Sequence, residues 1–333
     1  MNVALVKLSS LGDVVHALPV AATLRARLPQ ARITWIVERR EGAVLAGHPG
    51  LERVITVDTR RWRRSRTPGE LVESARGILA VRRQLRAARF DVALDLQGLI
   101  KSGLLVGLTR APLRIGFDAG WCRERLSVLA TNRRVTPPAH APHVVDQYLS
   151  LVDALGIDGR VLEFRLPSDP AAEARMDEFF AAAGLKPRNR VVVLNPGAGR
   201  AEKRWPIERF RALAGALSAG GGSRVIVVWG PGEEAVAEAI AAVGGPHVLL
   251  APRTDLLALI ALLRRAGVVV AADTGPLHLA AALGTPCVGL YGPTRAERNG
   301  PYGAGHRTLQ APDGRVETLD VDAVAAAARE LLG

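Results

Sequence analysis

The chain has 333 residues, 48% of them hydrophobic and 23% charged, which is typical of a globular protein with room for two domains. Its net charge is +12, and residues 1–160 hold nearly all of it, with 25 Lys and Arg against 14 Asp and Glu, compared with 19 against 18 in the remainder. This asymmetry predicts an anionic partner for the first half, such as nucleic acid, anionic lipid or a phosphorylated saccharide. Cys122 and Cys287 stand in no motif, which argues against a disulfide-stapled scaffold and fits a reducing compartment.

The first twenty residues are apolar but contain Lys7 and Asp13, and no small-residue cleavage site follows them. We therefore predict a first strand there and not a signal peptide. No stretch approaches the roughly 18 uninterrupted apolar residues that a membrane-spanning helix needs. We expect a cytoplasmic protein whose contact with a membrane is peripheral.

In the first half, short apolar runs alternate with longer helical patterns. The runs predict strands at residues 3–8, 33–37, 54–57 and 92–96. The patterns between them predict helices at residues 14–28, 68–88 and 99–109. Several of these strands are apolar at consecutive positions, which is typical of a parallel sheet covered on both faces.

The second half repeats this alternation. Its predicted strands are residues 191–194, 225–228, 247–250, 268–271 and 287–291. Its predicted helices are residues 171–183, 207–219, 233–243, 255–266 and 277–283. Asp255 is placed to begin a helix, and Gly220 and Gly284 are placed to end helices.

A stretch with Pro167 and Pro170, residues 157–169, predicts a linker. We therefore expect an N-terminal Rossmann-like domain at 1–160, a C-terminal one at 170–320, and a terminal helix within 321–333. Open α/β sheets bind ligands beyond the carboxyl ends of their strands, so two such domains facing each other predict a cleft with the chemistry just after the strands.

The first predicted strand leads into Ser9-Ser10-Leu11-Gly12-Asp13, which lacks the GxGxxG of dinucleotide-binding proteins. Asp13 stands at the start of a helix. It has two interpretations that the spacing leaves open. It is either a charge at the helix N-terminus that stabilises the helix dipole by roughly 0.3–1 kcal/mol, or a general base that removes a proton from an attacking hydroxyl.

Two segments of the second half carry phosphate-binding chemistry. Residues 195–206 follow a strand and combine small residues with Arg200 and Lys203, although no Walker A pattern is present. Asp273-Thr274-Gly275-Pro276-Leu277-His278 follows another strand and opens a helix, whose free N–H groups suit a phosphate. For residues 195–206, the alternative is an ordinary glycine-rich loop with solvated charges. For Asp273 or Thr274 it is a helix-capping residue, and for His278 it is a buried histidine that bonds to the backbone.

Two further groups lie in the first half. Asp95, Gln97, Lys101 and Ser102 follow a predicted strand, where a structural role is as reasonable as substrate contact. The strongest basic cluster is Arg60-Arg61-Trp62-Arg63-Arg64-Ser65-Arg66, to which Arg123 and Arg125 are candidate additions. Arginine suits bidentate contact with phosphate and carboxylate, while a solvated surface is the ordinary alternative.

Taken together, these segments resemble the lipopolysaccharide heptosyltransferases of glycosyltransferase family nine, and among them the type I enzymes. The resemblance rests on SSLGDVVHALP near the N-terminus, RRWRR, DLQGLIKS, KRWP and DTGPLHLAAALGTP, in that order. It covers most of the chain.

The resemblance implies a GT-B fold, an α/β architecture of two Rossmann-like, doubly wound domains facing across a cleft. It implies an inverting, metal-independent transfer, without a cofactor, of L-glycero-D-manno-heptose from ADP-heptose to a Kdo residue of lipid A-linked inner core. The alternative within the family is a type II or III heptosyltransferase or another glycosyl transfer. The partners implied are the ADP-heptose donor, the Kdo-lipid A acceptor and the anionic inner face of the inner membrane.

The resemblance also implies roles for individual residues. Asp13 and Lys203 are expected to be catalytic. The residues expected to bind the donor are Ala198, Gly199, Lys203, Glu234 (with Glu233 as the alternative), Thr254, Asp273, Thr274, Gly275 and His278. Those expected to bind the acceptor are Ser10, Gly12, Arg60, Arg61, Arg63, Arg64, Gln97, Lys101 and Arg123. Ala198 and Gly199 replace two threonines that are common in type I enzymes.

Two other classes of function have weaker support. A nucleic-acid-binding protein would explain the basic first half, but the sequence has no helix-turn-helix, zinc-finger or aromatic RNA-binding motif, so we expect no nucleic-acid partner. A nucleotide-dependent oxidoreductase is disfavoured by the missing GxGxxG.

Overall fold

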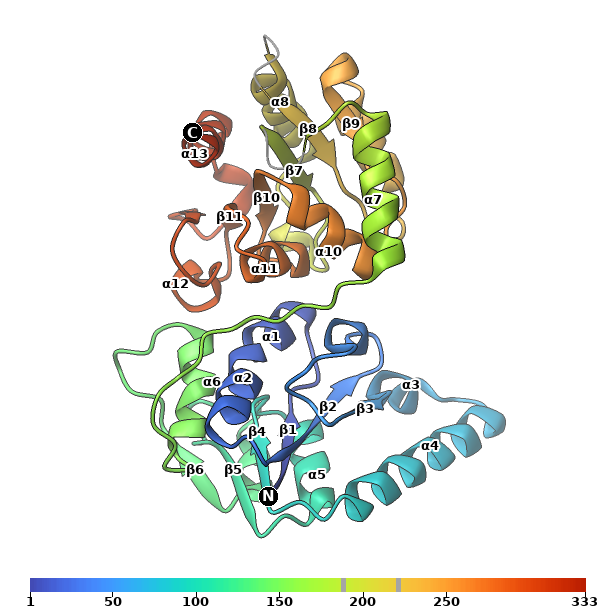
Figure 1. The fold of residues 1–333 in the computed structure, drawn as a ribbon, viewed down its shortest axis with the longest axis vertical. Helices are drawn as coiled ribbons and strands as arrows, with labels where there is room; N and C mark the ends of the chain where they lie inside the picture. Colours follow the sequence, from blue (N-terminus) through green and yellow to red (C-terminus); the bar gives the residue numbers. More distant parts are fainter. Residues whose placement is uncertain (187–189, 220–222) are drawn as a thin grey trace. The chain divides into compact units, whose positions relative to one another are not determined.

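The computed structural model describes residues 1–186, 190–219 and 223–333. Gly220, predicted to end a helix, lies outside these residues. The chain divides into two units, Met1–Arg165 and Leu166–Gly333, each with its own parallel sheet flanked by helices (Figure 1). Among the described residues, no helix is both long enough and apolar enough to cross a bilayer.

The first unit has a six-stranded parallel sheet in the order β3-β2-β1-β4-β5-β6. Its strands are β1 (Asn2–Val6), β2 (Arg32–Glu38), β3 (Arg53–Val57), β4 (Val92–Asp95), β5 (Leu113–Phe117) and β6 (Arg133–Val135). The first four confirm the predicted strands to within two residues. The last two were not predicted, because arginines interrupt their apolar pattern.

The helices of the first unit are α1 (Leu11–His16), α2 (Leu18–Arg27), α3 (Thr59–Arg64), α4 (Pro68–Ala87), α5 (Ile100–Thr109) and α6 (Val144–Asp153). The prediction of one helix over 14–28 was wrong. The chain forms two helices that meet at Ala17, and a proline opens the second. Proline at this position has no N–H to leave unpaired, so it suits the start of a new helix. Residues 60–64 of the basic cluster lie in α3, which ends before Ser65 and Arg66.

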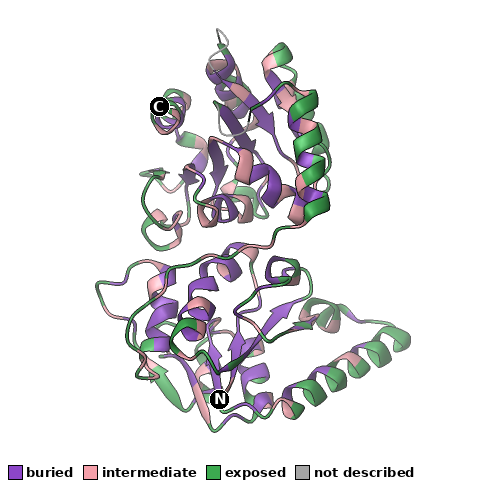
Figure 2. Ribbon diagram, in the orientation of Figure 1, coloured by how far each residue is buried: buried purple, intermediate pink, exposed green. Residues whose placement is uncertain are grey.

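The second unit has six parallel strands in the order β12-β11-β10-β7-β8-β9. They are β7 (Val191–Asn195), β8 (Arg224–Val227), β9 (Val248–Leu250), β10 (Val268–Ala272), β11 (Cys287–Tyr291) and the unpredicted β12 (Arg307–Gln310). Figure 2 shows the central strands buried and the outer faces of the helices exposed, whereas the edge strand β12 is mostly exposed.

The helices of the second unit are α7 (Pro170–Ala182), α8 (Ile207–Ser218), α9 (Glu234–Ala241), α10 (Leu256–Arg265), α11 (Gly275–Ala282), α12 (Ala296–Asn299) and α13 (Val321–Leu332). The Asp255 side chain caps α10 by accepting from the Ala258 N–H, as predicted. Gly284 has a φ of 72°, a conformation that favours glycine, just after α11.

When the strands of each unit are counted along the chain, both sheets have the same spatial order: third, second, first, fourth, fifth, sixth. This is the doubly wound order, in which the direction of winding reverses between the first and fourth strands. Ligands of such sheets bind beyond the carboxyl ends of the strands at that reversal. The loops after β1 and β4, and after β7 and β10, are therefore the places to look for a site.

Candidate active site

In the first unit, Asp13 lies in the first turn of α1 and is held by several polar groups. Its Oδ2 accepts hydrogen bonds from the Ser10 N–H at 3.0 Å and from the Ser10 hydroxyl at 2.9 Å. Its Oδ1 accepts one from the Tyr148 hydroxyl at 3.2 Å and lies 3.4 Å from the Lys7 Nζ. Asp13 is thus a charge at the start of the helix, as the structural alternative proposed, and it also belongs to the helix cap through Ser10. Its second oxygen makes contacts that neither structural role needs.

The charge of Asp13 is stabilised by this setting. Burial alone would raise the pKa of Asp13, but the Lys7 ammonium and the hydrogen bonds from Ser10 together hold that pKa well below its ordinary value. Its side chain is still 37% exposed, whereas that of Lys7 is 3% exposed. The arrangement therefore presents an ionised carboxylate to solvent from a fixed position.

Lys7 and Tyr148 were missed as site residues by sequence reasoning. The Lys7 ammonium donates to the Leu96 carbonyl at 3.1 Å and to the Tyr148 hydroxyl at 2.6 Å. Trp35 fixes the backbone beneath it, since its indole N–H donates to the Lys7 carbonyl at 3.0 Å. The only local signal was a lysine at the end of an apolar strand, because Tyr148 lies on α6, far away in the sequence.

Gln97 and Lys101 make contacts within the first unit. The Gln97 Oε1 accepts from the N–H groups of Leu8 and Ser9 at 2.9 and 3.2 Å and so shapes the loop that leads to Asp13. Lys101 pairs with Glu38 at 3.2 Å. These contacts support the structural interpretation of both residues and do not test their predicted contact with an acceptor.

Asp95 is buried at the end of β4. It accepts from the N–H groups of Gln97 and Gly98 and from the Ser102 hydroxyl, at 3.0 to 3.2 Å. Burial raises the pKa of Asp95, although these hydrogen bonds oppose the shift. Its contacts are those of a residue that orders the loop after β4.

The basic cluster forms a short exposed helix. The Asp58 side chain caps α3 by accepting from the Arg61 N–H at 3.1 Å, and the Arg61 guanidinium pairs with Glu73 on α4. Arg60, Arg63 and Arg64 are exposed, as is Arg123 in the segment after β5. These exposed side chains are available to an anion.

In the second unit, the structure brings three predicted donor-site residues together. The Lys203 Nζ lies 2.5 Å from Oδ2 of Asp273, and the His278 Nε2 lies 3.0 Å from Oδ1 of the same carboxylate. Burial would raise the pKa of Asp273, but hydrogen bonds and charge from His278 and Lys203 hold that pKa well below its ordinary value. One carboxylate thus anchors a lysine at the beginning of α11.

The first turn of α11 lies beside this lysine. Thr274 precedes the helix, and its hydroxyl donates to the Ala272 carbonyl at 3.1 Å and accepts from the Asn195 amide at 3.3 Å. This hydroxyl caps no N–H group of the helix. Pro276 has no N–H, and the His278 N–H donates to the Thr274 carbonyl at 3.4 Å. The N–H groups of Gly275 and Leu277 have no intrahelical acceptor, so this helix start can receive an anion.

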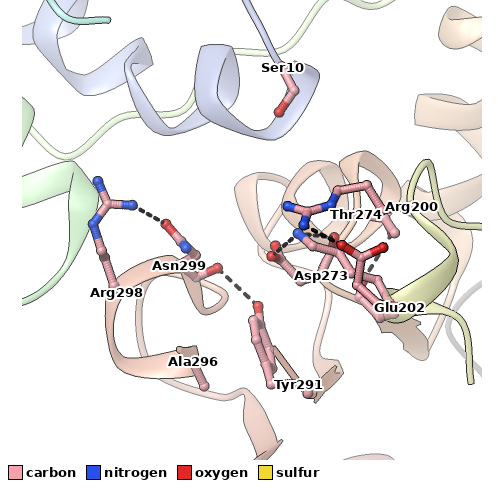
Figure 3. Close-up of polar contacts among 12 residues, drawn as sticks. Ser10, Arg200, Glu202, Asp273, Thr274, Tyr291, Ala296, Arg298 and Asn299 are labelled. Carbon is pink, nitrogen blue, oxygen red and sulfur yellow. Dashed lines mark hydrogen bonds and ion pairs between the residues drawn. The ribbon is translucent and has the colours of Figure 1, made fainter. Parts of the chain in front are cut away.

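Lys203 owes its position to the loop that carries it. It ends a short 3₁₀ turn, Ala201–Lys203, which Figure 3 shows near Asp273 and Thr274, with Arg200 and Glu202 forming an ion pair. Trp205 follows and is buried, with its ring edge-on to Phe210 at 5.0 Å between centroids.

Ala198 and Gly199 precede this turn. Ala198 is buried, and its carbonyl accepts from Arg204 at 3.0 Å. Gly199 is exposed, with open space where a side chain would stand.

A hollow of about 660 Å³ lies at the edge of the second sheet formed by β8 and β9. It is lined by Trp229, Pro231, Gly232, Glu234, Leu250, Ala251, Pro252 and Arg253. Glu234 therefore lies in a hollow wide enough for a nucleoside, and Thr254 is the next residue after Arg253. The alternative residue, Glu233, instead accepts from the Gly230 N–H at 3.0 Å and packs against Gly197.

Comparison with known proteins identifies the fold and family. The family model described as glycosyltransferase family 9 (heptosyltransferase) matches residues 78–320. The chain belongs to glycosyltransferase family 9. Lipopolysaccharide heptosyltransferase 1 of Escherichia coli K12 is 32% identical over 97% of this chain and 98% of its own length. The Salmonella typhimurium protein of the same name is 31% identical over 97% and 98%.

Solved structures of heptosyltransferases are similar to this chain over nearly its whole length. The E. coli heptosyltransferase WaaC with ADP is 30% identical, with a TM-score of 0.82 over 99% of this chain and 100% of that one. WaaC with ADP-2-deoxy-2-fluoro heptose is 31% identical, with a TM-score of 0.80 over 99% of each chain. This family 9 protein is therefore a glycosyltransferase with a GT-B-like fold of two α/β domains.

Proposed function

We propose that this glycosyltransferase transfers L-glycero-D-manno-heptose from ADP-heptose to a Kdo residue of lipid A-linked inner core, with inversion and without a metal ion. The observation that carries the proposal is the cluster of Lys203, Asp273 and the first turn of α11. It puts a cation beside free helix amides, which is what a departing diphosphate requires. The choice of sugar is supported by the similarity to lipopolysaccharide heptosyltransferase 1 and to WaaC with ADP-2-deoxy-2-fluoro heptose.

The donor would bind the second unit. The hollow beside β8 and β9 would take the adenosine, with the Glu234 carboxylate accepting hydrogen bonds from ribose hydroxyls and Thr254 at its rim. Lys203 and the amides near Thr274 and Gly275 would hold the diphosphate. Since Ala198 and Gly199 have no hydroxyls, the loop before Lys203 would contribute backbone N–H groups instead.

The acceptor would bind the first unit, with Asp13 as the general base. Lys7 and Ser10 keep the Asp13 carboxylate ionised, so it can accept the proton of the Kdo hydroxyl as that oxygen attacks the anomeric carbon. The bond from that carbon to the ADP oxygen breaks on the opposite face, which inverts the configuration. The electron pair leaves on the diphosphate, whose charge Lys203 and α11 stabilise, so a metal ion is not required.

Arginines of the first unit would guide the anionic acceptor. Arg60, Arg63 and Arg64 are exposed on α3, and residues 1–160 carry nearly all of the net positive charge. We propose that Ser10, Gly12, Gln97, Lys101 and Arg123 complete the acceptor site. Since the acceptor is anchored in lipid, we also propose that the protein works at the inner face of the inner membrane.

The direct test is incubation of the purified protein with ADP-heptose and Kdo-lipid A. The expected result is release of ADP together with a product heavier by one heptose. Product formation only from an acceptor that already carries heptose would favour a type II or III activity. Absence of ADP release with either acceptor would contradict heptosyl transfer.

A further inference from the structure

Helix α4 is the least buried long helix of the first unit. It has 20 residues, of which only Ser74, Val81 and Leu85 are buried. Figure 1 shows it running away from its sheet, and Figure 2 shows most of its surface exposed. The proposed sugar transfer does not use this helix.

The exposed surface of α4 carries an apolar stripe, which consists of Leu71, Val72, Ala75, Ile78 and Leu79. Successive residues of a helix are separated by roughly 100°, so this spacing gathers the five side chains on one side. The four large side chains are between 41% and 53% exposed. By the same spacing, the stripe adjoins the side that carries Ser74, Val81 and Leu85. One part of a wide helix face therefore packs on the first unit, and the neighbouring apolar part is exposed to solvent.

Arginines border and continue the stripe. By the same helical spacing, Arg82 and Arg86 extend it toward the C-terminal end of α4, while Arg76 and Arg83 lie along its edge. The two carboxylates of the helix lie elsewhere. Glu70 accepts from the N–H groups of Arg66 and Thr67, and Glu73 pairs with Arg61. The stripe therefore combines apolar and cationic groups and includes no acid.

A hollow of about 410 Å³ lies at the C-terminal end of α4. It is lined by Arg86, Arg89, Phe90, Asp91, Thr109 and Arg110. Asp91 is already engaged, since it accepts from the Asn2 N–H at 2.6 Å. The Arg86 Nε is buried and has no hydrogen-bond partner among the described residues. This hollow offers arginine donors to an anion of phosphate size.

We propose that α4 is an interfacial helix that docks the first unit on an anionic phospholipid bilayer. Its apolar stripe would enter the boundary between headgroups and acyl chains, and Arg82 and Arg86 would contact lipid phosphates. The inference adds a defined membrane contact to the proposed function, and it rests on that function only in requiring a reason for the protein to reach a membrane.

Charge favours a bilayer over a second copy of the chain. A second copy would bring the same arginine-bordered stripe, from a unit with a large positive excess, against the first. Like charges repel at such a contact, whereas an anionic leaflet attracts each arginine near its surface. The combination of exposed Leu and Ile with arginine on one helix is the pattern of helices that lie in the membrane interface.

The test is flotation of the full-length protein with phosphatidylcholine vesicles, with and without about one third phosphatidylglycerol. The wild type should float with the anionic vesicles, and less so as salt rises. The variant Leu71→Gln/Leu79→Gln should bind about tenfold more weakly. Leu162→Gln/Val243→Gln, which changes exposed apolar residues outside α4, should bind as the wild type does, and matching circular dichroism would show that all three proteins are folded.

Arg82→Gln/Arg86→Gln separates the electrostatic part, because it should lose most of the preference for anionic vesicles. Undiminished flotation of the Leu71→Gln/Leu79→Gln variant would overturn the proposal. So would a wild-type dimer in gel filtration that this variant converts to monomer, since a second copy would then cover the stripe. Flotation needs no turnover, so failure of the proposed sugar transfer would leave this result unaffected.

Discussion

Each unit has a lysine–aspartate ion pair, but the more exposed partner is the aspartate in the first unit and the lysine in the second. In the first, the Lys7 side chain is 3% exposed and its partner Asp13 is 37% exposed. In the second, Asp273 is 9% exposed and its partner Lys203 is 17% exposed. Both pairs lie at the carboxyl ends of sheets with the same strand order. The first unit thus presents a carboxylate, and the second presents an ammonium.

This difference teaches how one fold can supply two kinds of chemistry. A buried lysine keeps an exposed carboxylate ionised, which suits a proton acceptor. A buried carboxylate with two partners fixes a lysine beside helix amides, which suits a diphosphate.

Replacing the presented carboxylate should have the largest effect on turnover. Asp13→Asn keeps a side-chain oxygen for the helix cap but cannot take up the proton, so kcat should fall at least about 10²-fold. Steady-state ADP release measures the change. Asp169→Asn is the matched control, since it alters a carboxylate that caps α7, and it should turn over normally. Near-normal turnover of Asp13→Asn would remove Asp13 from the role of base.

Replacing the presented ammonium should cost less but affect the donor. Lys203→Met removes the positive charge beside α11, so kcat/KM for the donor should fall about 10²-fold or somewhat less. Arg211→Met removes an exposed cation on α8 of the same unit and should leave kcat/KM for the donor unchanged. An equal loss in both variants would mean that net charge, and not the position of Lys203, matters.

The buried lysine of the first unit should set the pH dependence. Because Lys7 lowers the pKa of Asp13, Lys7→Met should raise that pKa, and burial acts in the same direction. The acid limb of the pH profile of kcat/KM should then move to higher pH. An unmoved limb would show that Lys7 does not control the ionisation of Asp13.

Replacing the buried Asp273 carboxylate of the second unit should lower the thermal stability of the protein in a pH-dependent way. Asp273 has a folded pKa below its ordinary value of 3.8, so its charge stabilises the folded state above that pH, and this contribution is lost as pH falls below it. Asp273→Asn should therefore lower the melting temperature at pH 7 more than at pH values below 3.8. Calorimetry at a series of pH values checks this, and a deficit independent of pH would contradict it.

Sequence patterns predicted the central strands because these strands are apolar at consecutive positions. They failed at β5, β6 and β12, where arginines at partly exposed positions break the apolar run. The boundary between α1 and α2 was also missed, since both helices are apolar across it and only a proline marks the second. Periodicity reports burial, and it weakens wherever a strand or helix is partly exposed.

Sequence reasoning could select candidate site residues where a motif lies within one loop, as it did for Asp273, Thr274 and Gly275. It selected Asp13 too, but it did not predict the contacts of Asp13, because Tyr148 reaches that carboxylate from α6, far away in the sequence. The sequence suggested a lone aspartate, whereas the structure shows one that shares its oxygens with a lysine, a serine and a tyrosine.

The most direct test of the separate roles of the two units is calorimetric titration of ADP into the wild type, Asp13→Asn and Lys203→Met. If the first unit supplies the base and the second holds the diphosphate, ADP should bind Asp13→Asn as tightly as the wild type and Lys203→Met about tenfold more weakly. Weakened binding to Asp13→Asn together with unchanged binding to Lys203→Met would contradict it.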